Sequence, residues 1–120
     1  MKLSLLTFMN KFSESYTERY DNYQFSFDIP DKEKFDPEIA SVDVKLKTMN
    51  GDEYYGSFTT LHFLEYMFDK NKRTGECANG SYFCMPRMIV VERIDEEIIK
   101  STIDDLVYNN EFEEYFTKMD

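Results

Sequence analysis

The chain has 120 residues, with 24 acidic side chains against 14 basic ones, and therefore a formal net charge of −10. It is 42% hydrophobic and 17% aromatic, enough apolar material for one core, which excludes a disordered chain. The length fits a single domain over residues 1–120, and a pI near 4.5 argues against proteins that bind nucleic acid or an anionic membrane through positive charge.

The sequence contains no targeting or membrane signal that we expect to operate. No run of 18 or more apolar residues predicts a transmembrane helix. Residues 1–9 imitate the start of a signal peptide, but Asn10 and Lys11 interrupt the apolar run and no small-residue cleavage site follows. We therefore expect a cytoplasmic protein. Cys77 and Cys84 lack neighbouring histidines, which predicts two reduced thiols, at least one of them buried, rather than a zinc site.

The first part of the chain predicts a helix and a strand. Apolar residues recur at helical spacing between Leu5 and Tyr20, which predicts an amphipathic helix over residues 3–20. Residues 23–29 alternate aromatic and polar side chains, as a strand does, and Pro30 is expected to end that strand. The charged segment between Pro30 and Pro37 is expected to form an exposed loop.

A β-hairpin is predicted next. Apolar and charged residues alternate from Val42 to Lys47, the pattern of a half-buried strand, and Asn50-Gly51 follows as a turn signal. A two-residue turn would pair Leu46 with Tyr55. This register places Tyr55 on the core face and Tyr54 on the opposite face.

A capped helix and a strand are predicted after the hairpin. Thr59 or Thr60 can cap a helix whose apolar stripe begins at Leu61, and Gly75 can end it. Four consecutive apolar residues at 88–91 predict a central strand covered on both faces.

The last part of the chain is predicted to be helical. Asp95 can cap a helix that Asn109-Asn110 ends, and residues 111–118 can form a last short helix. The elements together predict an α+β fold, with an antiparallel sheet of about four strands and helices packed on one face.

Catalytic chemistry is not predicted. His62 is the only histidine, and Glu65 could share its helix face, but no nucleophile motif accompanies it. A Cys–His pair with Cys77 or Cys84 stays open, although no local motif supports one. Adjacent carboxylates such as Asp104-Asp105 carry little weight in a chain with 24 acids, and no calcium-loop pattern is present. We expect no enzymatic activity, no metal site and no cofactor.

The distribution of charge is more informative than any motif. Residues 92–120 hold ten acids and three bases, so this quarter contributes −7 of the total −10. Such a field has two explanations: it favours solubility, or it binds a positively charged protein with tyrosines as anchors. On the second explanation the partner-binding residues are predicted to be Asp104, Asp105, Tyr108, Glu111, Glu113 and Glu114, with a second patch at Asp31, Glu33 and Asp36.

A family resemblance points to the same class of partner. Residues 58–63, 70–76, 79–83 and 88–91, followed by a short acidic helix, resemble the small bacterial immunity proteins encoded beside polymorphic and contact-dependent growth inhibition toxins. The resemblance covers roughly residues 42–116. It implies a protein that binds a cognate toxin domain, often a basic nuclease, and occludes its active site. It implies no particular inhibitory residue and no oligomeric state.

Two other function classes stay open at this point. A nucleic-acid mimic, such as an anti-defence protein of phage type, would spread its carboxylates at phosphate-like spacing, whereas here the acids gather in one quarter of the chain. A small enzyme or ligand-binding domain would need an apolar pocket that holds His62, Cys77 or Cys84.

Overall fold

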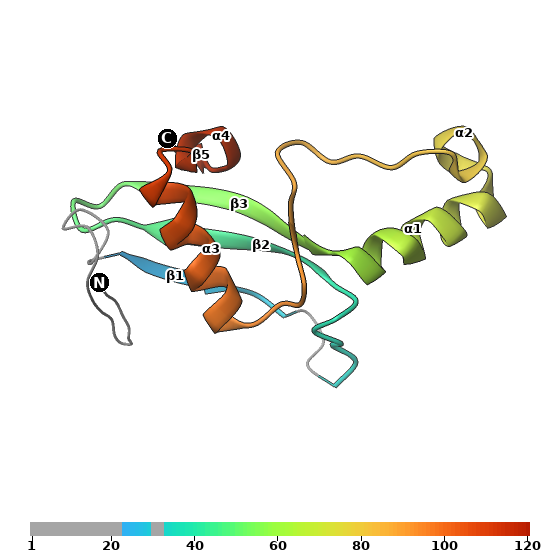
Figure 1. Cartoon of the computed structure of the whole chain (residues 1–120), viewed down its shortest axis with the longest axis horizontal. Coiled ribbons are helices and arrows are strands. Elements are labelled where there is room, and N and C mark those ends of the chain that lie inside the picture. Colours follow the sequence, from blue (N-terminus) through green and yellow to red (C-terminus); the bar gives the residue numbers. More distant parts are fainter. Residues whose placement is uncertain (1–22, 30–32) are drawn as a thin grey trace.

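The computed structural model describes residues 23–29 and 33–120 and shows an α+β fold (Figure 1). The helix expected over residues 3–20 and the acidic residue Asp31 lie outside the described residues. Within the described ranges, none of the helices combines the length and the apolar character that a membrane span requires. The elements are β1 (Gln24–Phe27), β2 (Ser41–Lys47), β3 (Glu53–Thr60), α1 (Leu61–Thr74), α2 (Glu76–Gly80), β4 (Ile89–Val91), α3 (Glu96–Tyr108), α4 (Phe112–Tyr115) and β5 (Thr117–Lys118).

The strands form one sheet in the order β1-β2-β3-β4, and β5 also pairs with β3. All the pairings are antiparallel except that of β3 with β4, which is parallel. The expectation of a central, doubly covered strand at 88–91 is wrong: β4 is a short edge strand, and the side chain of Val90 is exposed. The preceding apolar run, residues 82–85, forms no strand.

The β2–β3 hairpin forms where the sequence predicted it, but its register differs by one residue. Leu46 pairs with Tyr54 instead of Tyr55. The loop has three residues, because Thr48 and Asp52 pair across it, and only Gly51 adopts a positive φ, of 93°. A two-residue turn of type I′ would need positive φ at both positions, whereas this loop is typical of a type I turn followed by a glycine bulge. Tyr54 therefore lies on the core side and Tyr55 is exposed.

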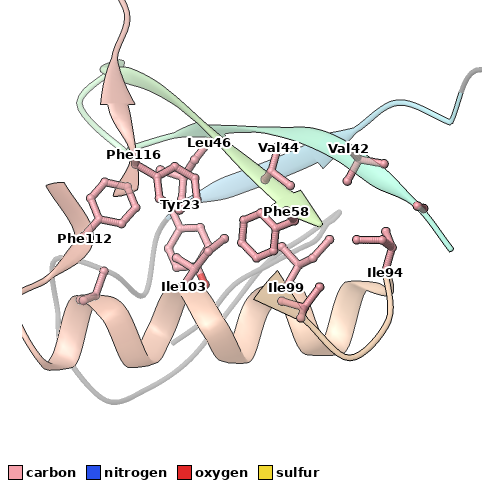
Figure 2. Packing of buried hydrophobic residues seen from close by; sticks show 13 residues of the cluster. Tyr23, Val42, Val44, Leu46, Phe58, Ile94, Ile99, Ile103, Phe112 and Phe116 are labelled. Atoms are coloured by element: carbon pink, nitrogen blue, oxygen red, sulfur yellow. The ribbon is translucent and has the colours of Figure 1, made fainter. Parts of the chain in front are cut away.

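The core lies between the sheet and α3 (Figure 2). Asp95 accepts a hydrogen bond from the backbone N–H of Ile98 at 2.8 Å and begins α3, as predicted. The side chains of Ile99 and Ile103 then meet the apolar side of β2, which carries Val42, Val44 and Leu46. At the far end, the rings of Phe112 and Phe116 stack with their centroids 4.5 Å apart. The predicted short helix is thus docked, but it is α4 and spans only four residues.

The α1 helix does not cover the sheet, so the expectation of helices packed on one face holds for α3 but not for α1. Thr60 is both the last residue of β3 and the N-cap of α1, and its hydroxyl accepts from the backbone N–H of Phe63 at 3.2 Å. With no loop between strand and helix, α1 runs outward beyond the end of the sheet (Figure 1).

A left-handed turn follows α1. Gly75 ends the helix with φ +85°, as predicted, and α2 then winds through positive φ at Cys77, Ala78 and Asn79. Gly80 closes the turn so tightly that an added Cβ would lie 2.7 Å from the backbone nitrogen of Lys72 and 2.9 Å from the carbonyl oxygen of Phe68. The expectation of a buried cysteine is wrong, because this turn leaves Cys77 half-buried and the unpaired segment after it leaves Cys84 exposed. Both thiols are free.

Candidate partner-binding surface

The acids of the last quarter of the chain fall into two groups. One group forms ion pairs inside the protein: Arg93 pairs with Glu92 and Asp95, and Lys100 pairs with Asp104. Asp95 is held in place further by the N–H of Ile98, and this hydrogen bond, aided by Arg93, lowers the pKa of its carboxyl below the usual range. These acids serve the fold.

Asp104 was predicted to contact a partner protein, but in the structure its carboxylate binds other residues of this chain. Its two carboxylate oxygens accept from the hydroxyl of Tyr23 at 2.6 Å and from the ammonium of Lys100 at 2.7 Å. Tyr23 is only 1% exposed, and the Lys100 ammonium also lies 5.7 Å from the centre of its ring. Asp104 therefore anchors the start of β1 to α3, a contact across 81 positions that no sequence pattern signals.

The second group gathers where α3 ends and α4 begins. Asn110 adopts a positive φ of 61°, and the N–H of Glu111 donates to the carbonyl of Leu106 at 2.7 Å, so the chain reverses sharply. We call the surface at this reversal the acidic end; it consists of Asp105, Tyr108, Glu111, Glu113 and Glu114. In the described part of the chain no ion pair involves its four carboxylates. Tyr108 is the last residue of α3, and 74% of its surface is exposed.

Residues distant in sequence lie close to the acidic end. The ring of Tyr54 contacts Phe112 of α4 edge-on, with the centroids 5.1 Å apart. Through the pairing of β3 with β5, Lys118 comes within 3.6 Å of Asp52 and the N–H of Met119 donates to the carbonyl of Glu53. The exposed side chain of Glu53 thus lies on the strand beside β5, a neighbour that spacing along the chain could not reveal.

The predicted second patch belongs to a different part of the surface. Glu33 and Asp36 are exposed in the loop before β2, and the carbonyl of Pro37 in that loop accepts from the N–H of Ile94, just before α3 begins. The acidic end lies at the other end of α3, whose 13 residues span about 20 Å. The Asp36 carboxylate also accepts from the backbone N–H of Glu38 at 2.9 Å, which shapes the loop itself.

The candidate catalytic residues His62 and Glu65 are neighbours on α1. His62 is exposed on α1, and its Nε2 lies 3.9 Å from the carboxylate of Glu65, as their spacing suggested. In the part of the chain that the structure describes, no group of three or more His, Cys, Asp or Glu side chains is arranged to hold a metal ion.

No protein-family model, curated protein or solved structure matches this chain.

Proposed function

We propose that this chain is an immunity protein that binds and neutralises a basic toxin domain, with a nuclease as the favoured target. The observation that carries the proposal is the acidic end: four carboxylates that form no ion pair among the described residues, together with the exposed Tyr108. A nuclease active site binds phosphates and is electropositive, so such a surface complements it in charge.

The acidic end can increase both the association rate and the affinity for a positively charged partner. Its carboxylates attract a positive partner over about 8 Å at physiological salt and form charge-assisted hydrogen bonds with Lys and Arg on contact. The ring of Tyr108 offers an apolar anchor between them, and its hydroxyl can bond at the rim. Bound there, the protein would cover the positive cleft and keep the nucleic acid substrate out.

The direct test is co-expression with the toxin encoded beside this chain, combined with binding kinetics on the purified pair. We expect Asp105→Lys with Glu113→Lys to abolish protection and to slow association, because both side chains are exposed and both charges reverse. Tyr108→Ala should cost at least about 2 kcal/mol, roughly a 30-fold loss of affinity, mainly through faster dissociation.

The matched control reverses two exposed acids elsewhere, with Asp28→Lys and Glu38→Lys. It changes the net charge by the same amount but leaves the acidic end intact, so protection should persist. If the control pair loses binding and the test pair keeps it, the acidic end is not the interface. If the wild-type chain gives no protection at all, the proposed function is wrong.

A further inference from the structure

The most exposed large hydrophobic side chain in the described part of the chain is Met49, in the loop between β2 and β3. Its exposed fraction is 77%, and Tyr108 comes next at 74%. The other exposed large hydrophobic side chains lie between 36% and 59%. Single exposed hydrophobic residues are common on proteins, so exposure alone assigns Met49 no role. Two features of the fold distinguish it: its loop is closely hydrogen-bonded, and that loop lies beside the acidic end.

The loop holds Met49 in place by hydrogen bonds on both sides of it. The N–H of Gly51 donates to the carbonyl of Thr48 at 3.0 Å, and the N–H of Thr48 donates to the carbonyl of Asp52 at 2.8 Å. Inside the loop, the side-chain oxygen of Asn50 accepts from the hydroxyl of Thr48 and from the N–H of Asp52. A loop closed in this way has little conformational freedom left to lose on binding, so an apolar side chain at its tip is a preorganised anchor.

The end of this loop is joined to the acidic end through β5. Lys118 of β5 lies 3.6 Å from Asp52, and the N–H of Met119 donates to the carbonyl of Glu53 at 2.7 Å. One residue separates β5 from α4, which carries two carboxylates of the acidic end. Figure 1 shows the turn between β2 and β3 at the same end of the sheet as the last turn of α3. Met49 and the acidic end therefore belong to one end of the molecule.

The charge at this end stays negative up to the loop. Glu53 adds an exposed carboxylate, and Asp52 is paired with Lys118. Lys47 lies opposite Glu53 in the pairing of β2 with β3 and forms no ion pair within the described ranges. Together with the four carboxylates of the acidic end, these residues make six acids and two bases, a net charge of −4. A partner that fits here is basic around an apolar recess.

Carboxylates and apolar anchors contribute differently to such a contact. Charge steers any basic protein to this end and increases its association rate, but it discriminates poorly between one basic partner and another. An apolar side chain gains affinity only where the partner offers a recess of matching shape. Methionine and tyrosine are both enriched in the cores of protein interfaces. Met49 is thus suited to select one partner among several basic proteins.

We infer that Met49 is a specificity-determining anchor, and that the partner-binding surface extends from the acidic end to the tip of the β2–β3 hairpin. The inference rests on the proposed function, so the partner is the basic toxin domain. Its surface offers Met49 an apolar recess with Lys and Arg side chains on the rim. The carboxylates of the acidic end pair with that rim, and Tyr108 is the second anchor.

The first experiment measures binding of the purified toxin encoded beside this chain to Met49→Gln, which keeps the length of the side chain and removes its apolar end. We expect the affinity to fall about 10- to 100-fold, mainly through faster dissociation. This loss should be the same at low and high salt, whereas the loss caused by Asp105→Lys with Glu113→Lys should shrink as salt rises. Because Met49 is exposed, its replacement should leave the melting temperature unchanged.

Two controls separate the anchor from general surface effects. Leu61→Gln changes another exposed side chain, 59% exposed just beyond the opposite end of β3, and should bind the toxin like the wild type. A polylysine peptide is a partner with charge and no recess. It should bind Met49→Gln and the wild type equally, and should bind Asp105→Lys with Glu113→Lys more weakly.

Methionine oxidation locates the anchor without any substitution. Hydrogen peroxide transfers one oxygen atom to the thioether, which gives the sulfoxide and water, and peptide mass spectrometry yields a rate for each methionine. In the free chain, Met49 should react faster than the half-buried Met67 of α1. In the complex, Met49 should be protected at least about tenfold, while Met67 keeps its rate.

Three results would overturn the inference while the proposed function stands. The first is a chain that protects cells but whose Met49→Gln variant binds the toxin as tightly as the wild type. The second is a Met49 that oxidises as fast in the complex as in the free chain. The third is an equal loss of affinity for the toxin and for polylysine in Met49→Gln. If the wild-type chain neither binds the toxin nor protects against it, the proposed function is wrong and the inference fails with it.

Discussion

Asp104 and Asp105 are neighbouring aspartates, but the structure predicts different losses of stability when each is replaced by alanine. Asp104→Ala leaves the Tyr23 hydroxyl, in a residue only 1% exposed, without its acceptor at 2.6 Å. Removing the acceptor of a buried hydroxyl costs about 1–3 kcal/mol, and losing the partly exposed i,i+4 pair with Lys100 adds about 0.3–0.5 kcal/mol. Asp105 is exposed, and among the described residues its side chain accepts only from Asn109, at 3.3 Å.

Both substitutions gain the same helix propensity, so the difference between them is dominated by the contacts that Asp104 makes with Tyr23 and Lys100. We expect Asp104→Ala to lower the free energy of unfolding by about 2 kcal/mol relative to Asp105→Ala, which corresponds to about 8 °C in melting temperature. Urea unfolding followed by circular dichroism measures it. Asp104→Asn keeps an acceptor for the tyrosine and should recover most of the loss.

A double-mutant cycle gives the decisive check. Tyr23→Phe removes the donor, so Asp104→Ala should cost at least about 1 kcal/mol less in that background. If Asp104→Ala and Asp105→Ala are equally stable within about 0.5 kcal/mol, the contact between β1 and α3 does not contribute as argued. Charge reversal at Asp104 is consequently a poor probe of partner binding, whereas reversal at Asp105 is a clean one.

Three further predictions concern stability. Gly56→Ala should cost about 1–3 kcal/mol, because its Cβ would lie 2.9 Å from the buried ring of Phe116; thermal melts measure this. Asp95→Ala should cost about 1 kcal/mol at pH 7, since the N–H of Ile98 loses its cap. The pKa of Asp95 is lowered in the folded state, so its contribution is present above about pH 4 and the gap to the variant should close as the pH falls through the folded pKa. Ala78→Gly should stabilise α2 by about 0.5–1 kcal/mol, since φ is +51° there, and slower hydrogen exchange in α2 would show it.

The sequence alone was sufficient wherever the deciding interactions are local. The caps at Thr60 and Asp95 and the stop at Gly75 each depend on hydrogen bonds within four residues, and all three are confirmed. The alternation along β2 likewise predicts which of its side chains are buried. The excess of acid at the end of the chain is a matter of counting, so that feature of the candidate site was visible from the start.

Tertiary structure decided everything that depends on partners distant in the chain. The hairpin register was settled by a three-residue loop and by Phe116, whose ring occupies the space beside Gly56. Only the folded chain shows that Asp104 turns inward to Tyr23, that β4 is an edge strand, and that α1 extends away from the sheet. The physical reason is the same in each case: a side chain's type and spacing determine what it can bond to, but the surface available to it is created by segments that pack beside it only in the fold.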